Sequence, residues 1–194
     1  MTLVGFKRMT IRVLDGEDTP TLGKNLFVVE GKTGEGATQV AKITGLSNEP
    51  VKTYGSDMTY HVASRGVGDV KVETTAVDIP IVVENAIIGY KVVDDLIYDG
   101  SSTEAPYCAL LLESSTPAGD AAYLGFFKGK FSLDNLEIET LKEKQEELKG
   151  DVLTFSASAS DDEETRGDVM VKYFGKEETK INKAKGQLKM VARG

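Results

Sequence analysis

The segment "EGKTGEGA", residues 30–37, contains the residue types of a phosphate-binding loop. A P-loop places a glycine five residues before its Gly-Lys-Ser/Thr end, and a helix follows it, so that backbone amides surround the phosphates. The triplet Gly31-Lys32-Thr33 has Leu26 at the position of that glycine, and no helical pattern follows. The residues therefore predict a flexible loop here and not a nucleotide site.

Two single residues could also carry chemistry, and each has a simpler structural explanation. Cys108 is the only cysteine, which excludes an internal disulfide and suits a reducing compartment. It lies in the apolar run "YCALLLE", where a buried thiol is expected. His61 is the only histidine, so a site with several histidine ligands is excluded. Because no acid–base pair can be nominated, the sequence predicts no enzyme, no cofactor and no metal.

Charge is unevenly distributed along the 194 residues. The formal net charge is −8, yet residues 176–194 hold six basic and two acidic side chains. The body is therefore acidic and should repel DNA, which is itself a polyanion. The basic end either binds a phosphate backbone or an acidic neighbour, or forms a solvated, partly disordered terminus. No stretch approaches the roughly 18 apolar residues of a membrane helix, so no membrane contact is expected.

Most of the chain has the alternation of β-strands. The clearest case is 152–160, where Leu153 and Phe155 alternate with small polar residues. Leu110 to Leu112 form a continuous apolar run, which is expected for a strand covered on both faces. Strands are predicted at 4–14, 25–30, 38–46, 51–64 (two pieces around a turn), 68–79, 90–100, 105–114, 121–133 and 152–160. In 121–133, Phe127 and Phe131 are expected to face the same side.

Only one segment is predicted to be a stable helix. In "DIPIVVENAIIGY", residues 78–90, apolar residues recur at helical spacing, with Asp78 as the cap, Pro80 in the first turn and Gly89 at the end. The charged segment 140–149 has good helix formers but only Leu141 and Leu148 as large apolar residues. Because helices are stabilised mainly by packing an apolar face, a solvent-facing connection or an extended edge is favoured there.

These elements describe a mainly β protein with one short amphipathic helix packed on a sheet. Such a sheet has open edges, which must be paired, covered or charged. A short helix covers only one face. The sequence therefore favours self-assembly, in which the edge strands are completed by another copy.

A series of segments shares its order and spacing with one known family. The segments are "VGFKRMTIRVLD", "AKITGL", "GVGDVKVE", "DIPIVVENAIIGYK", "APYCALLLES", "YLGFFKGKFSL", "EKQEELKGDVLTFSASASDD" and "GDVMVKYFG". Of these, "GVGDV", "KGKFSL" and "EKQ" followed by "GDVLTF" are the most specific. They resemble the major tail protein, or tail tube protein, of long-tailed, siphovirus-type bacteriophages of Gram-positive hosts. The resemblance covers residues 3–162 and leaves the end of the chain unassigned.

The resemblance implies a fold and a function. The fold is a β-sandwich or small barrel of two packed sheets flanked by one short helix at about 78–88, with residues 1–162 as the tube domain and 163–194 as a partly basic extension or arm. Copies form hexameric rings that stack into the tube of a non-contractile tail, a conduit for genome ejection. The implied partners are other copies, the tape measure protein and genomic DNA in the lumen, and tail terminator and distal tail proteins at the ends. Made in the host cytoplasm, the protein ends in the virion.

Three sets of residues are expected to take part in the assembled tube. The loop of Gly31, Lys32, Thr33, Gly34, Glu35 and Gly36, within 15–37, is a candidate ring-to-ring contact, as is 47–60. The acidic side chains of Glu137, Glu139, Glu143, Glu146 and Glu147 are candidates for the lumen wall, where they would keep DNA from sticking; the alternative is that they face outward for solubility. The alternative function is a non-catalytic β-sandwich that binds carbohydrate or protein, although the chain has no tryptophan for sugar stacking.

Overall fold

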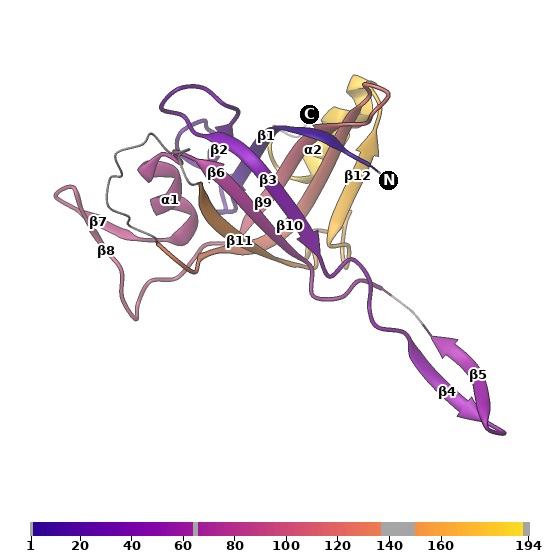
Figure 1. Cartoon of the computed structure of the whole chain (residues 1–194). Coiled ribbons are helices and arrows are strands. Elements are labelled where there is room, and N and C mark those ends of the chain that lie inside the picture. Colours follow the sequence, from indigo (N-terminus) through magenta and orange to yellow (C-terminus); the bar gives the residue numbers. More distant parts are fainter. Residues whose placement is uncertain (1, 64–65, 137–149, 192–194) are drawn as a thin grey trace, which may run out of the picture.

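One curved antiparallel sheet of eight strands forms the centre of the computed structural model, which describes residues 2–63, 66–136 and 150–191 (Figure 1). The strand order is β2-β1-β9-β10-β11-β6-β3, with β12 added to β10. The bounds are β1 Val4–Val13, β2 Leu26–Val29, β3 Ala37–Thr44, β6 Lys71–Val77, β9 Cys108–Ser115, β10 Ala121–Leu133, β11 Asp151–Ser158 and β12 Met170–Phe174. The predicted mainly β fold of packed sheets is confirmed, and the sheet does not close into a barrel.

Strand β10 divides the sheet into two halves. On one edge it pairs with β9, and on the other it pairs first with β12 and then with β11. The strands β11, β6 and β3 therefore fold back over β1 and β9, and the Thr38 hydroxyl of β3 donates a hydrogen bond of 2.8 Å to the Phe6 carbonyl of β1. The main apolar core fills the space between the two halves.

A β-bulge in β10 changes which side chains enter that core. Between Phe126 and Gly129, β10 advances by three residues while β9 advances by two. The extra residue reverses the alternation, so Phe126 and Phe131 face the main core whereas Phe127 faces the opposite side. The prediction that Phe127 and Phe131 share a face is therefore wrong. Only glycine fits at the bulge, because a Cβ on Gly129 would lie 2.4 Å from the Phe155 ring.

Helix α1 (Ile81–Ile88) closes one end of the core with Val83, Ile87 and Ile88, which confirms the predicted helix. It ends at Gly89, whose φ of 84° and close approach to the Glu104 carbonyl both require glycine. The predicted cap is wrong. Asp78 has a φ of 54°, Pro80 occupies the N-cap position, and no side chain caps the helix.

A second helix, α2 (Glu178–Gln187), lies against β10 and β12 on the outer face of the sheet (Figure 1). Leu188 and Met190 follow it and pack with Ala109, Leu111 and Phe127 in a second apolar cluster. Strand β9 is thus buried on both faces, as its continuous apolar run predicts. The division at residue 162 stays a prediction, while β12 is itself a strand of the sheet and the segment after α2 packs on it.

Two hairpins stand apart from this sheet. They are β4 (Val51–Gly55) with β5 (Met58–Ala63), and β7 (Lys91–Val93) with β8 (Leu96–Tyr98). Figure 1 shows them projecting from opposite ends of the molecule. The predicted hairpin around Gly55-Ser56-Asp57 is confirmed, whereas the single strand predicted at 90–100 is a hairpin that turns at Asp94 and Asp95. No helix in the described ranges is long and apolar enough to cross a membrane.

Candidate assembly surfaces

The loop at 31–36 is a closed turn between β2 and β3. The amide of Gly31 donates to the Gly36 carbonyl at 3.0 Å, and Lys32 forms an ion pair of 2.7 Å with Glu30. The hydrogen bond from Lys32, with Arg8 nearby, lowers the pKa of Glu30. Strand β3 follows where a P-loop needs a helix. The lysine is therefore neutralised within its own loop, and its role in ring-to-ring contact stays a prediction.

The β4–β5 hairpin carries exposed apolar side chains and touches little of the body. Its exposed large side chains are Val51, Tyr54, Met58, Tyr60 and Val62. An isolated two-stranded hairpin is marginally stable in water. Within the predicted contact segment 47–60, this hairpin is therefore the part that most needs a partner surface.

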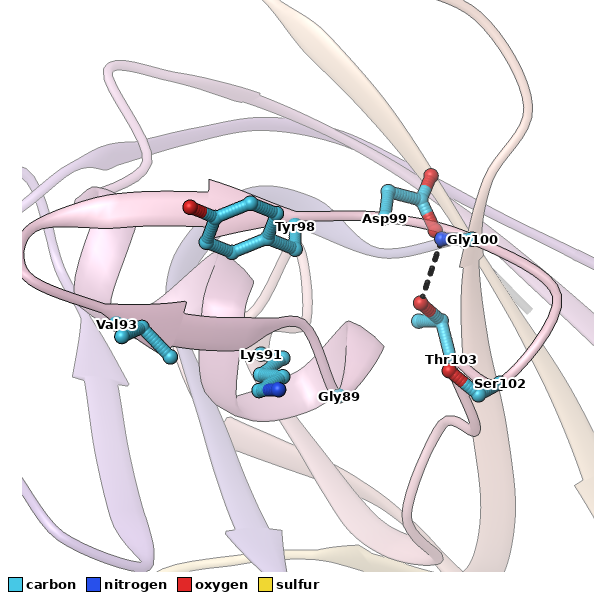
Figure 2. Close-up of a pocket in the computed structure, with 8 residues that line it drawn as sticks. All are labelled: Gly89, Lys91, Val93, Tyr98, Asp99, Gly100, Ser102 and Thr103. Carbon is cyan, nitrogen blue, oxygen red and sulfur yellow. Dashed lines mark hydrogen bonds between the residues drawn. The ribbon is translucent and has the colours of Figure 1, made fainter.

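The β7–β8 hairpin also carries exposed apolar side chains, at the other end of the molecule. They are Val92 and Ile97 on one face of the hairpin and Val93, Leu96 and Tyr98 on the other face. Against the second face lies a cavity of about 480 Å³ (Figure 2). Monomeric proteins rarely leave large apolar patches uncovered, so this hairpin also indicates a contact.

A third surface is polar and belongs to the half of the sheet that α2 leaves uncovered. We call it the polar face. It is formed by the outward side chains of β3, β6, β11 and the second half of β10, which pair across the strands in rows such as Lys42, Glu73, Thr154 and Ser132. Its other members are Val40, Thr44, Lys71, Thr75, Lys128, Lys130, Val152, Ser156 and Ser158.

All four lysines of the polar face are paired with carboxylates. The ion pairs are Lys42–Glu73 at 3.4 Å, Lys71–Asp69 at 3.1 Å, Lys128–Asp161 at 2.6 Å and Lys130–Glu104 at 3.0 Å. The hydrogen bond from Lys128 lowers the pKa of Asp161. The face therefore presents hydroxyl groups and compensated charges, and it offers no obvious chemistry for catalysis.

The model of the phage tail tube protein family matches residues 1–193. The chain belongs to this family. The resemblance to a major tail protein is thereby confirmed, and the match also includes residues 163–193, which the resemblance left unassigned. The family is structural and non-catalytic, and its members assemble into the tube of the virion tail. The chain matches no curated protein and no solved structure.

The acidic side chains predicted for the lumen of this tail tube protein, Glu137 to Glu147, lie outside the described residues. The segment connects β10 to β11, and its flanking residues can be placed. Asp151 begins β11 near Glu84 of α1. Burial raises the pKa of Glu84, and the Asp151 carboxylate adds to the rise. The lumen assignment of the glutamates stays a prediction.

The basic end of the tail tube protein is largely neutralised within its own subunit. Its lysines pair with carboxylates of the same chain: Lys176–Asp120 at 3.4 Å, Lys180–Glu177 at 2.7 Å, Lys183–Glu164 at 3.8 Å, Lys185–Glu113 at 3.7 Å and Lys189–Asp162 at 3.6 Å. These mostly exposed pairs are individually weak. Together they reduce the charge that the end can offer to DNA or to an acidic neighbour.

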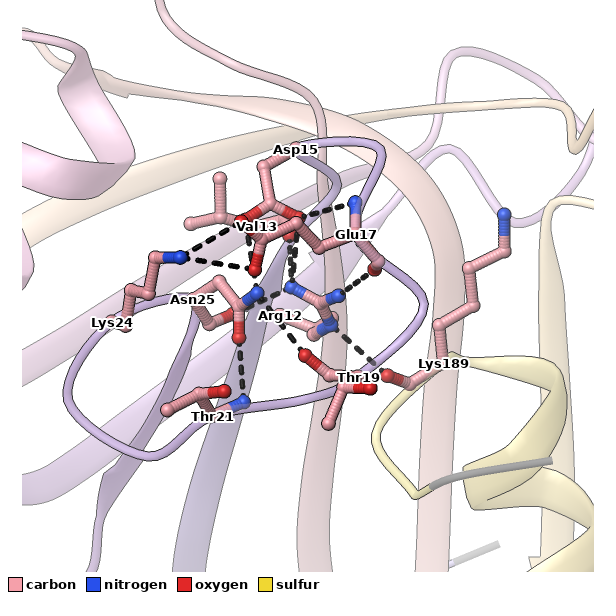
Figure 3. A network of polar contacts seen from close by, with 9 residues as sticks. All are labelled: Arg12, Val13, Asp15, Glu17, Thr19, Thr21, Lys24, Asn25 and Lys189. Carbon is pink, nitrogen blue, oxygen red and sulfur yellow. Dashed lines mark hydrogen bonds and ion pairs between the residues drawn. The ribbon is translucent and has the colours of Figure 1, made fainter.

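A buried arginine that sequence reasoning missed holds this end against the sheet (Figure 3). Arg12 is 1% exposed. Its guanidinium donates to the carbonyl oxygens of Val13, Glu17, Asn25 and Lys189, and it lies 3.3 Å from the Asp15 carboxylate. Burial acts to raise the pKa of Asp15, but hydrogen bonds from Asn25 and the Glu17 amide and the charge of Arg12 lower it overall. Arg12 thus joins β1 to the 15–25 loop and to the segment after α2.

Proposed function

We propose that this protein polymerises as hexameric rings stacked into the tube of a long non-contractile phage tail, the conduit for genome ejection into the host. The observation that carries the proposal is the polar face. A sheet half with one face in the core and the other rich in hydroxyls and compensated charges suits a wall that encloses a hydrated polyanion.

The polar face is proposed to line the lumen because its charges are arranged against DNA binding. An unpaired lysine that contacts a phosphate releases counterions and gains affinity. A genome in transit would be slowed by each such contact. With every lysine of the face within 3.4 Å of a carboxylate, these contacts are weakened. The glutamates of 137–147 would add negative charge to the same wall.

Ring closure is proposed to use the open edge of β3. This strand of eight residues pairs only with β6 in the described sheet. An exposed edge carries free backbone donors and acceptors that a strand from another copy can pair with. A neighbouring copy on this edge would continue the polar face around the ring.

Stacking is proposed to use both ends of β3. The 31–36 loop precedes the strand, and the β4–β5 hairpin follows at its other end (Figure 1). A subunit with different contact surfaces at its two ends stacks head to tail, which gives an open polymer. Genomic DNA and a tape measure protein would occupy the lumen, and tail terminator and distal tail proteins would bind the two ends.

Electron microscopy of the purified protein over a range of concentrations tests this proposal. We expect rings and tubes, with class averages of end views that have six-fold symmetry. On the same negatively stained grids, the lumen should appear as a stain-filled channel along the tube axis. A protein that remains monomeric at high concentration, or that forms filaments without a central channel, would contradict the proposal.

A further inference from the structure

We propose that the cavity under the β7–β8 hairpin is a receptor for a tyrosine side chain, and that its occupant is Tyr60 from the β4–β5 hairpin of another copy. This inference rests on the proposed function, because it names the contact through which subunits of successive rings join.

The cavity has the walls that an aromatic ring with one polar group requires. Val93 and the Tyr98 ring supply apolar surface, and Lys91, Asp99 and Ser102 supply polar groups at the rim (Figure 2). The cavity is open to solvent on one side, and its volume of about 480 Å³ leaves room for a tyrosine ring. A tyrosine fits such a site because its ring is apolar while its hydroxyl can donate to a carboxylate, and a lysine can lie over the ring.

The far wall of the cavity is fixed before any partner arrives. The Gly100 amide donates to the Thr103 hydroxyl at 3.0 Å, which holds the turn at 100–103 in shape. The Gly89 end of α1 forms another part of the wall, where no side chain would fit. A pre-formed site loses less conformational freedom on binding than a flexible one.

Tyr60 is displayed as a donor for such a site. At 82% it is the most exposed of the large apolar side chains in the described residues. The strand register passes from Thr53 opposite His61 to Tyr54 opposite Thr59, so Tyr60 is the extra residue of a β-bulge. Bulges re-aim side chains, and this one leaves a large aromatic ring in water.

The positions and charges of the two hairpins indicate that the tyrosine in the cavity comes from a second copy of the chain. The two hairpins project from opposite ends of one molecule, so Tyr60 cannot reach the cavity of its own chain (Figure 1). Residues 91–104 hold one lysine and four carboxylates, whereas the β4–β5 hairpin, residues 51–63, holds one lysine and one aspartate. The receptor segment is therefore acidic and the hairpin has no net charge, so two receptor ends repel each other while the hairpin can approach a receptor without repulsion.

One such contact is too small to act alone. A stable interface buries about 800 Å² on each partner, more than a hairpin tip supplies. Rings present several copies of the contact at once, and multivalency then raises the overall affinity. The contact is thus expected to control the concentration at which tubes form.

A double-mutant cycle on polymerisation tests the pairing. Tyr60→Ala removes the donor, and Ser102→Tyr fills the receptor. Each single change should raise the critical concentration for tube formation about tenfold or more, the scale of an interface hot spot. The double variant should be no worse than either single variant, because both remove the same contact. Tyr54→Ala, on the same hairpin, is the matched control and should have a much smaller effect. Circular dichroism and thermal melts verify that each subunit is folded.

Cross-linking supplies a second measurement. Chains with Tyr60→Cys and Ser102→Cys, treated with a short bis-maleimide that replaces the length of the ring, should give a ladder of multimers on a denaturing gel. The pair Tyr60→Cys and Ser156→Cys should not, because Ser156 lies on the polar face. The proposed contact would be contradicted if the effects of Tyr60→Ala and Ser102→Tyr on the critical concentration were additive. Equal ladders from the two cysteine pairs would contradict it as well. If the unmodified chain forms no tubes, the proposed function is contradicted. If tubes form but the effects of Tyr60→Ala and Ser102→Tyr are independent, only the proposed contact between these two sites is contradicted.

Discussion

The two halves of the sheet differ in how much of their surface is covered by other residues of the same subunit. In the half formed by β1, β9 and the start of β10, apolar side chains are covered on both faces, by the main core and by the cluster below α2. In the half formed by β11, β6 and β3, only one face enters the core, and among the described residues the polar face is mostly exposed. We call the half covered on both faces the closed half and the other the open half. The closed half can therefore supply the stability of the subunit, while the open half supplies a surface for assembly.

This difference follows from the residues on alternate positions of each strand. Leu110 and Leu111 of β9 are both buried, one on each face. In β11, Phe155 is buried whereas its neighbour Ser156 is exposed. A strand with apolar residues on both faces must be covered twice, and a strand with alternating residues must be covered once. The comparison predicts that substitutions in the two halves have separable effects on folding and on assembly.

The largest expected effect separates two adjacent residues of β11. Phe155→Ala should lower the free energy of unfolding by about 3–5 kcal/mol, because it leaves a cavity between Phe126 and Phe131. The ring centroid of Phe155 lies 4.9 Å from that of Phe131. Ser156→Ala, on the open face, should change it by less than about 0.5 kcal/mol. Urea denaturation measures both, and comparable losses would show that the polar face is not free of the subunit's own packing.

A slightly smaller loss is expected at the junction of α2 with the sheet. Leu188→Ala should lower the free energy of unfolding by about 2–3 kcal/mol, since Leu188 is fully buried but belongs to the smaller apolar cluster. The loss should appear in the single cooperative transition of the whole chain. Were residues 163–194 an independent arm, the variant would instead melt in a separate early step while the β domain kept its midpoint. Lys183→Ala, on the exposed side of α2, is the matched control.

Much of the β-rich fold could be predicted because it depends on local patterns. The alternation at 152–160 and the apolar run at Leu110 to Leu112 each specify how many faces of a strand are buried. Gly89 marks the end of α1 because the left-handed conformation there favours glycine. These signals lie within a few neighbouring residues and need no knowledge of the rest of the chain.

The features that were missed depend on contacts between distant segments. Phe127 changes sides because Gly129 leaves room for Phe155, which belongs to another strand. Helix α2 has few apolar residues of its own, and its register is decided by Leu188 against β9 and β10. Arg12 is buried because carbonyl groups from β1, the 15–25 loop and the segment after α2 converge on it, and the sequence places no pattern around it. The candidate assembly surfaces were only partly visible for the same reason, since the Tyr60 bulge and the cavity at Tyr98 arise from strand pairing.

Cys108 allows the packing of the closed half to be tested by the pH dependence of stability. Burial raises the pKa of its thiol to about 12, from a usual value of 9.0. The folded state therefore holds the proton more tightly than the unfolded state. Stability from this group is complete below pH 9.0 and is lost as the pH rises toward about 12. The wild-type chain should lose stability over this range more steeply than Cys108→Ala, as measured by urea denaturation at each pH. Parallel profiles would mean that water reaches the thiol and that this part of the core is open.

The smallest effect on the subunit is expected on the polar face, where the consequence should appear only in the assembled tube. Glu73→Gln removes the carboxylate that faces Lys42 at 3.4 Å. Both side chains are about half exposed or more, so the stability of the subunit should change by less than about 1 kcal/mol. In a tube, each freed lysine becomes able to contact a phosphate, which adds about 0.9 to the slope of log affinity against log salt. DNA binding by tubes should therefore rise at low salt and fall again as salt is added.

Glu177→Gln, which frees Lys180 on α2, is the control, since α2 covers the other half of the sheet. If both variants bind DNA to the same extent, the polar face does not line the lumen, and the open half of the sheet must serve a contact between subunits instead.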